Sequence, residues 1–363
     1  MIFVKYLFLK LDNYYLFSFI LISVLLLTTN HYTYEQSLLL NQLDSKSYYL
    51  ISKNSPELLF SQEIPYHHYQ RFLFPYIIGI ISEIFGFEIF SIYKVLTILV
   101  LIFISIIHKK ILIKINQNFE TSIILLSVII FSPYLSRYIV SIPLMLVDLC
   151  FVLISYLIIL AFLCNSKWIY LFIQLSLFFR LSGIAIVIGY IGSNIFNYKK
   201  NLSKIFFTIT SSIIIIFFLS FIANKFTNSE FNNLHYLGLI KEFNFNRLLQ
   251  TIIFIFKPII CFLPLIFLLI FFKIEKKNFI FEKFIFFLSI PLLIIGQPIL
   301  GGEFVTGNNI FRLSSLALPF FIIYFAILFK PKISLNNNFL YFLLINFIYS
   351  FHPKYSILSI FFN

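Results

Sequence analysis

"SIPLMLVDLCFVL", residues 141–153, lies within an apolar run that extends from about 139 to 163. A helix rises about 1.5 Å per residue, so this run exceeds the roughly 20 residues that are needed to cross a bilayer. The only acid in it, Asp148, is about ten residues into the run and therefore near mid-bilayer. The stretch predicts a transmembrane helix with a charge inside it, and such charges are rare unless paired or functional.

Similar apolar runs continue along the chain on both sides of this one. The predicted helices lie at about 14–29, 92–107, 121–136, 139–163, 167–179, 181–197, 205–223, 250–272, 284–299, 311–329 and 338–351. The composition is 60% hydrophobic and only 11% charged, with a mean hydropathy of +0.97. It is typical of membrane proteins and excludes a soluble class. We predict an all-α polytopic membrane protein with about 11 transmembrane helices, forming one integral membrane domain over residues 1–363.

The segment 71–86 makes the number of helices uncertain by one. It is short for a span and contains Pro75, Gly79 and the acid Glu83. These features favour a segment that lies at the interface or re-enters the membrane. If it crosses, there are twelve helices.

Basic residues predict the orientation of the chain. Their clusters fall on one side of the predicted helices, at Lys5 and Lys10, 108–114, Lys167, 197–204, 273–277 and 330–332. The positive-inside rule then places the N-terminus in the cytoplasm. A partly helical loop, 30–70, lies outside, with further outer segments at 224–246 and 301–309. This topology explains the net charge of +13 without a nucleic-acid partner.

"DSKSYYLIS", residues 44–52, lies in the first outer loop and has two interpretations. Ser47, Tyr48 and Ile51 follow Asp44 at helical spacing, which is typical of a short surface helix capped by Asp44. Alternatively, Asp44 is a general base whose pKa is raised because the adjacent lipid removes its hydration.

All five arginines fall on the predicted outer side or at outer helix ends: Arg71, Arg137, Arg180, Arg247 and Arg312. A guanidinium binds phosphate with two parallel hydrogen bonds, which predicts a phosphate site. The alternative is that long cationic side chains reach from the lipid to the interface. That alternative is weakest for Arg180, which interrupts an apolar stretch.

Other polar residues give weaker signals. Asp148 is predicted to form an intramembrane ion pair with Lys94 or Lys257, or to be functional. His67 and His68 have no acid or further histidine at the spacing of a metal site, so we predict no cofactor and assign no metal to them, with a metal site as the minor alternative. The chain has no P-loop, GxGxxG, GxSxG or HExxH motif, so a cytosolic nucleotide has no evident site.

Four stretches together resemble the glycosyltransferase C superfamily, in particular bacterial mannosyltransferase-like members. They are "LDSKSYYLISKNSP", "YHHYQRFLFPYIIGII", "FFRLSGIAIVIGY" and "GEFVTGNNIFRLSSLALPFF". The family shows an Asp in the first outer loop, an aromatic segment with proline, a later Arg-Ser/Thr-Gly element and a late Arg before a proline. Ser52 stands where the family often has Ala, and no second acid adjoins Asp44.

The resemblance implies transfer of a sugar from a polyprenyl-phosphate donor to an acceptor hydroxyl on a glycan, lipid or protein. Asp44 would deprotonate the acceptor, while Arg180 and Arg312 would hold the phosphate. Arg71, Tyr48 and Glu303, from the same stretches, would complete the substrate site. A transporter or flippase remains the first alternative, because intramembrane charges such as Asp148 suit alternating access. Another envelope-polysaccharide enzyme or an acyltransferase is the second alternative, and a noncatalytic scaffold the third.

Overall fold

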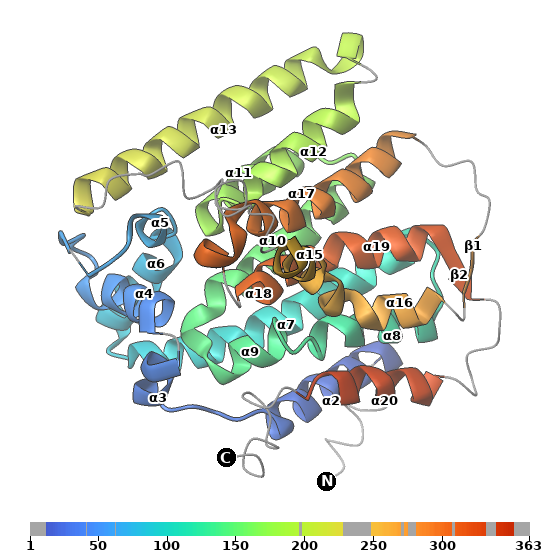
Figure 1. Ribbon diagram of the computed structural model, residues 1–363, viewed down its shortest axis with the longest axis horizontal. Helices are drawn as coiled ribbons and strands as arrows, with labels where there is room; N and C mark the ends of the chain where they lie inside the picture. Colours follow the sequence, from blue (N-terminus) through green and yellow to red (C-terminus); the bar gives the residue numbers. More distant parts are fainter. Residues whose placement is uncertain are drawn as a thin grey trace.

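The computed structural model describes residues 12–40, 42–61, 63–195, 198–227, 248–269, 272–274, 281–306, 309–331 and 339–351. In these ranges the chain is almost entirely helical (Figure 1), which confirms the predicted all-α class. The one exception is a pair of three-residue antiparallel strands, β1 (Phe272–Ile274) and β2 (Phe329–Pro331), which the sequence did not predict.

The helices follow the predicted apolar runs closely. The first half contains α2 (Asn13–Thr28), α3 (Tyr34–Leu40), α4 (Gln42–Asn54), α5 (Tyr66–Tyr69), α6 (Leu73–Phe85), α7 (Ile89–Lys114), α8 (Phe119–Ile130), α9 (Ser136–Ser141), the 3-10 turn η1 (Pro143–Met145) and α10 (Leu146–Leu163). The second half contains α11 (Trp168–Phe179), α12 (Gly183–Ile195), α13 (Tyr198–Phe226), α15 (Leu248–Phe256), η4 (Lys257–Phe262), α16 (Leu263–Leu269), α17 (Phe281–Thr306), α18 (Asn309–Ser315), α19 (Leu318–Leu328) and α20 (Phe339–Tyr349).

Five helical segments are long and apolar enough to cross a membrane, and a sixth follows if the bent pair α18 and α19 is one span. The five are 89–114, 143–163, 201–226, 250–269 and 282–302. They indicate an integral membrane protein. The other predicted spans form helices of 10–17 residues, and α6 belongs to the same short class. The count of about 11 spans, and the interfacial position of 71–86, therefore stay predictions.

The run 139–163 is broken near its start, contrary to the prediction of one helix. Pro143 has a fixed φ and no backbone N–H, and a 3-10 turn forms there between α9 and α10. Asp148 is consequently the third residue of α10 and lies in its first turn, not in the middle of a span. The break moves the acid to one end of the helix bundle.

The turn predicted over 301–309 is also wrong in part. Residues 301–306 continue α17, with a kink at Gly302, whose φ of 74° and ψ of 174° are not helical. A glycine tolerates this φ without the steric penalty that a side chain would add.

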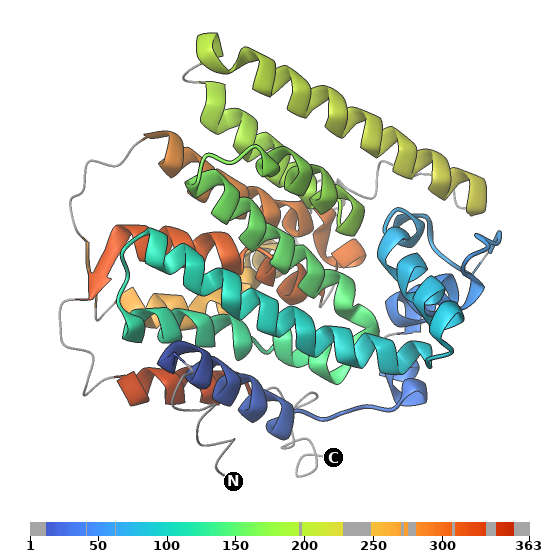
Figure 2. The same ribbon diagram turned by 180° about the vertical axis from the view of Figure 1, so that it is seen from behind.

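The core is centred on α10, which packs against α7, α11 and α19. Most of its side chains are buried, in keeping with a hydropathy that is high on every face. Helix α7 runs from the end formed by α3–α6 to the opposite end of the molecule (Figure 2). α13 is the least buried span and lies along one edge (Figure 1), with its apolar side chains open to lipid.

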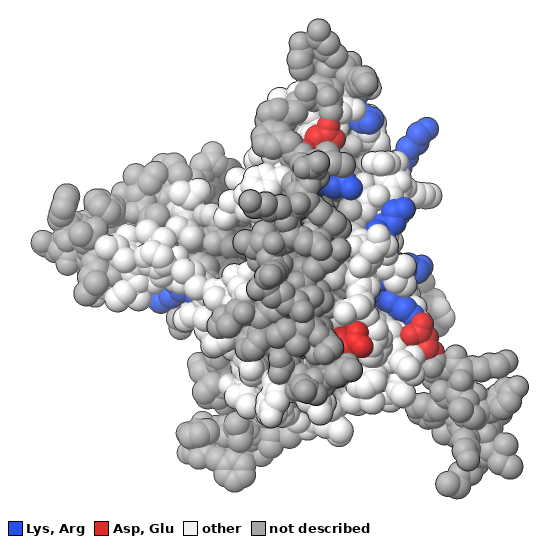
Figure 3. Space-filling model, turned by 90° about the vertical axis from the view of Figure 1, so that its right-hand side faces the viewer, with Lys and Arg blue, Asp and Glu red and all other residues white. Residues whose placement is uncertain are grey.

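Basic segments gather at the end opposite α3–α6. An ion pair between Lys109 and Asp12 places the end of α7 beside the start of α2. In the β1–β2 pair, Lys273 lies opposite Lys330, so two predicted basic clusters are neighbours. Figure 3 looks onto this end and shows several Lys and Arg side chains on it. Basic residues from several of the predicted clusters therefore lie near one another at this end.

Candidate functional site

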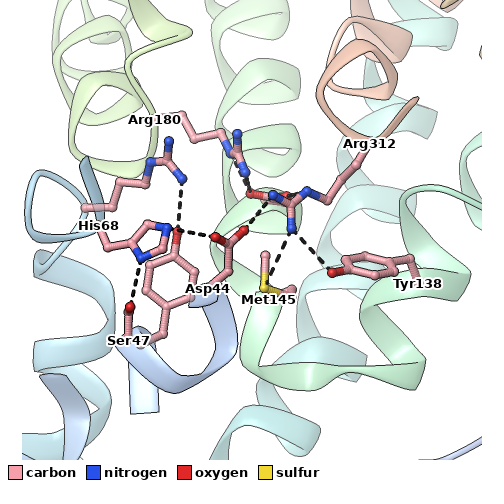
Figure 4. A network of polar contacts seen from close by, with 10 residues as sticks. Asp44, Ser47, His68, Tyr138, Met145, Arg180 and Arg312 are labelled. Atoms are coloured by element: carbon pink, nitrogen blue, oxygen red, sulfur yellow. Dashed lines mark hydrogen bonds and ion pairs between the residues drawn. The ribbon is translucent and has the colours of Figure 1, made fainter. Parts of the chain in front are cut away.

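Five charged side chains from distant parts of the sequence converge at the α3–α6 end, and Figure 4 labels three of them, Asp44, Arg180 and Arg312. Asp44 comes from α4, Asp148 from the first turn of α10, and Arg312 from α18. Arg180 is the C-cap of α11, where an extended backbone (φ −156°, ψ 144°) separates α11 from α12. Arg71 lies between α5 and α6. Four of the predicted site residues, Asp44, Arg71, Arg180 and Arg312, are thus close together.

Asp44 is held by two side chains. Arg312 donates from Nη2 to Oδ2 at 2.6 Å, and Nε2 of His68 lies 2.7 Å from Oδ1. Helix α4 begins at Gln42, so Asp44 occupies its first turn. The prediction that Asp44 caps this helix is wrong, because the carboxylate is turned toward Arg312 and His68.

His68 connects Asp44 to a buried hydroxyl. Its side chain is 1% exposed, and Nδ1 lies 2.8 Å from Ser47 Oγ. An ionised carboxylate only accepts hydrogen bonds, so Nε2 carries the proton and Nδ1 of the neutral ring accepts from Ser47. Sequence reasoning missed this role, because His68 is 24 positions from Asp44 and no local spacing relates them.

The pKa of Asp44 is lowered, contrary to the predicted rise. Burial on its own would raise the pKa of this carboxyl, but the charge of Arg312 and the hydrogen bond from His68 outweigh it. Burial lowers the pKa of His68, and contact with Asp44 offsets this only in part. At neutral pH Asp44 is therefore ionised and His68 is neutral.

Asp148 forms the second half of the cluster. Arg180 bonds its Oδ1, and Nε of Arg312 lies 3.5 Å from its Oδ2. The predicted ion pair exists, but the partners are arginines. Lys94 Nζ instead lies 4.6 Å from the ring centre of Phe90, and Lys257 Nζ lies 5.4 Å from that of Phe254 on α15. Arg180 and Asp148 are 2% and 0% exposed, so this pair is fully desolvated.

Arg71 is the least engaged of the three guanidinium groups. Its Nη1 donates to the hydroxyl of Tyr48 at 3.1 Å. Its Nε is buried and has no hydrogen-bond partner among the described residues. Tyr48 is itself 0% exposed. It therefore orients Arg71 through this hydrogen bond and offers no surface to a substrate. A buried donor without a partner is costly unless a ligand completes it.

Arg312 also contacts α9 and η1 (Figure 4). Its Nη1 donates to Tyr138 Oη at 3.3 Å and lies 3.8 Å from Met145 Sδ.

Three guanidinium groups surround two carboxylates in the described cluster, which leaves a net charge of +1 with His68 neutral. An arrangement of this kind favours an anion.

The remaining predicted residues lie elsewhere. Arg137 is buried and donates to the carbonyl oxygen of Thr28 and to the hydroxyls of Thr28, Thr29 and Ser350. It therefore caps the C-terminal end of α2, as a cation at a helix C-terminus does. Glu303 belongs to α17, and its side chain lies outside the described residues, as does Arg247.

The position of Asp44 depends on close contact between α4 and α6. Ser52 Oγ lies 2.8 Å from the carbonyl oxygen of Pro75 and 3.1 Å from Tyr93 Oη on α7. A Cβ built on Gly79 would come within 2.1 Å of the Ser52 carbonyl oxygen. Only a glycine fits where α6 crosses α4 this closely.

Comparison with known proteins adds no relative. No protein-family model, no curated protein and no solved structure matches the chain. The site is accordingly interpreted from its geometry alone.

Proposed function

We propose that the protein is a membrane glycosyltransferase that moves a sugar from a polyprenyl-phosphate donor to an acceptor hydroxyl. The observation that carries the proposal is the cluster of Asp44 with Arg71 and Arg312, a carboxylate beside guanidinium groups with a net positive charge. Sugar transfer from a lipid phosphate needs a base for the acceptor and cations for the phosphate that leaves.

Arg71 and Arg312 are the proposed phosphate ligands. Arg71 has a buried Nε without a partner among the described residues, and Arg312 already contacts two carboxylates. A phosphate between them would accept charge-assisted hydrogen bonds in a site of low dielectric constant. Arg180 already pairs with Asp148 through Nε and Nη2, so we assign it the role of positioning Arg312 through that carboxylate.

Asp44 is a poor base while Arg312 holds it, because the ion pair stabilises the ionised form. We propose that the donor phosphate competes with Asp44 for Arg312 and thereby weakens the ion pair between Arg312 and the Asp44 carboxylate. Asp44 would then be basic enough to accept the proton of the acceptor hydroxyl only when the donor is bound. His68, which remains bonded to Oδ1, would keep the carboxylate oriented.

The proposed setting is the outer face of a bacterial inner membrane, with about 11 spans and a cytoplasmic N-terminus. The site lies at the start of α10, and Lys167 follows the other end of this helix. With 18 residues the helix is about 27 Å long. A lipid-linked donor suits this position, because its tail can approach through the bilayer from between the helices. Membrane lipids and a glycan, lipid or protein acceptor are the proposed partners.

The test compares variants in a transfer assay with polyprenyl-phosphate sugars, normalised to membrane abundance. Arg71→Lys and Arg312→Lys keep the charge but lose the planar fork, so kcat/KM should fall by about 10- to 100-fold, or about 1–3 kcal/mol. Asp44→Asn should abolish transfer. Lys46→Gln, an exposed change two residues from Asp44, is the control. Full activity in Asp44→Asn would contradict the proposed base.

A further inference from the structure

We infer that Asp44, His67 and His68 bind a divalent transition metal, with Zn²⁺ as the best-suited ion. Each of the three offers one ligand atom, and these atoms lie within 4.8 Å of one another. His68 Nε2 and Asp44 Oδ1 are already 2.7 Å apart. Ligand atoms about 2.0–2.2 Å from one zinc ion are separated by little more than 3 Å, so small shifts suffice.

The donor set selects the class of metal. Two imidazole nitrogens and one carboxylate oxygen suit zinc and its neighbours in the transition series, whereas Mg²⁺ and Ca²⁺ prefer oxygen ligands. Three protein ligands leave a fourth position open, which is the pattern of zinc sites that contact a substrate or water. His67 is exposed, so the site is open to solvent on the side of this ligand.

Neighbouring groups are arranged to support metal ligation. If His68 gives Nε2 to the metal, its proton moves to Nδ1, which then donates to Ser47 Oγ at the existing 2.8 Å. Arg312 holds the other oxygen of Asp44 and leaves Oδ1 for the metal. Such outer hydrogen bonds fix the tautomer and the orientation of metal ligands. The change of tautomer releases no net proton.

The arginines weaken the site but do not exclude it. Arg312 repels a dication, while Asp44 attracts both cations because its single negative charge is shared between two oxygens, one facing Arg312 and one facing the histidines. The inference concerns metal binding and holds whether or not the chain transfers sugars. It goes beyond the sequence-based interpretation, which assigned no metal because no acid stands at ligand spacing from the histidines. Folding supplies that acid from 23 positions upstream of His67.

The experiment uses the purified full chain in detergent, stripped with a chelator and titrated with Zn²⁺ and, separately, Mg²⁺ by calorimetry. We expect one saturable Zn²⁺ site per chain and weaker binding of Mg²⁺. His67→Ala, an exposed change, should weaken Zn²⁺ binding at least tenfold, as should His68→Gln. His31→Ala, an exposed histidine after α2, is the matched control and should leave the affinity unchanged.

The inference fails if the wild-type chain shows no saturable Zn²⁺ binding or binds Mg²⁺ more tightly. It fails equally if His67→Ala binds Zn²⁺ as the wild type does, or if His31→Ala loses as much affinity as His67→Ala. A transfer assay on the same preparations separates the two proposals, because Arg71→Lys should lose transfer and keep Zn²⁺ binding.

Discussion

Asp148 is fully buried and Asp44 is 13% exposed, and arginines contact both carboxylates. Taking a carboxylate and a guanidinium out of water costs several kcal/mol for each ion, and only close, shared contacts repay it. Arg312 satisfies this condition for both acids, since it contacts Asp44 Oδ2 and approaches Asp148 Oδ2. Loss of one member leaves the others uncompensated, so substitutions in the cluster are expected to act together.

Asp148→Asn should be strongly destabilising, because it leaves Arg180 buried beside a neutral amide. We expect a cost of about 3–5 kcal/mol, seen as loss of protein from the membrane and an earlier thermal midpoint in detergent. Asp12→Asn removes a pair in which the acid is half-exposed and should cost less than about 1 kcal/mol. Adding Arg180→Gln to Asp148→Asn should restore part of the loss. A mild phenotype for Asp148→Asn alone would contradict a fully desolvated pair.

Arg137→Lys tests a different use of a buried arginine. Lysine keeps the charge but cannot reach Thr28, Thr29 and Ser350 with one planar group. We expect a lower thermal midpoint with unchanged kcat/KM for the protein that remains folded. A fall in kcat/KM comparable with that of Arg312→Lys would place Arg137 in the site after all.

Sequence reasoning identified the residue types of the site but not their pairing. Asp44 and the arginines were predicted because charges are conspicuous in an apolar chain. Asp44 and Arg312 are 268 positions apart, and no periodicity carries information about such a contact. For the same reason Asp148 was assigned a lysine partner, and the link from Asp44 through His68 to Ser47 was missed.

At the scale of elements, hydrophobic length predicted where most helices lie but not where they break. α7, α13 and α17 match single apolar runs, although each extends beyond its run. The unpredicted break at Pro143 turns the run 139–163 toward the site, whereas the break at Arg180 falls between two runs that the sequence already separates. A proline predicts such a break only with some probability, since it is tolerated in membrane helices, and α17 contains two.

Gly79→Ala should disturb the site from a distance. The added Cβ overlaps the Ser52 carbonyl oxygen and Ser55 Cβ, so α4 must move away from α6 and carry Asp44 with it. Overpacking of this kind costs about 1–3 kcal/mol, and transfer should fall along with stability. Gly296→Ala in α17 is the control, because no atom outside its own helix lies within 4 Å of the added Cβ. Its stability should be unchanged or slightly higher. Equal behaviour of the two variants would show that the α4–α6 contact is looser than described.

At the scale of the whole molecule, the lysine clusters and the Asp44 cluster lie at opposite ends of the helix bundle. The lysine-rich end and the Asp44 cluster are joined by α7 and α10, both of which pass the length and hydropathy test for a span. Helices of this kind align with the bilayer normal to within a few tens of degrees. The two ends are therefore expected to face opposite compartments, and the positive-inside rule assigns the lysine-rich end to the cytoplasm.

Cysteine labelling decides this orientation. Cys164 is exposed and near Lys167, so the starting chain carries Cys164→Ser. In intact cells an impermeant thiol reagent should label Lys46→Cys, which is exposed two residues from Asp44, and should not label Lys110→Cys at the end of α7. Permeabilised cells should label both, which shows that Lys110→Cys is reactive. The reverse pattern in intact cells would turn the Asp44 cluster toward the cytoplasm. A lipid-phosphate donor on the outer face would then be the wrong substrate, because the acceptor and the base would lie on the inner side.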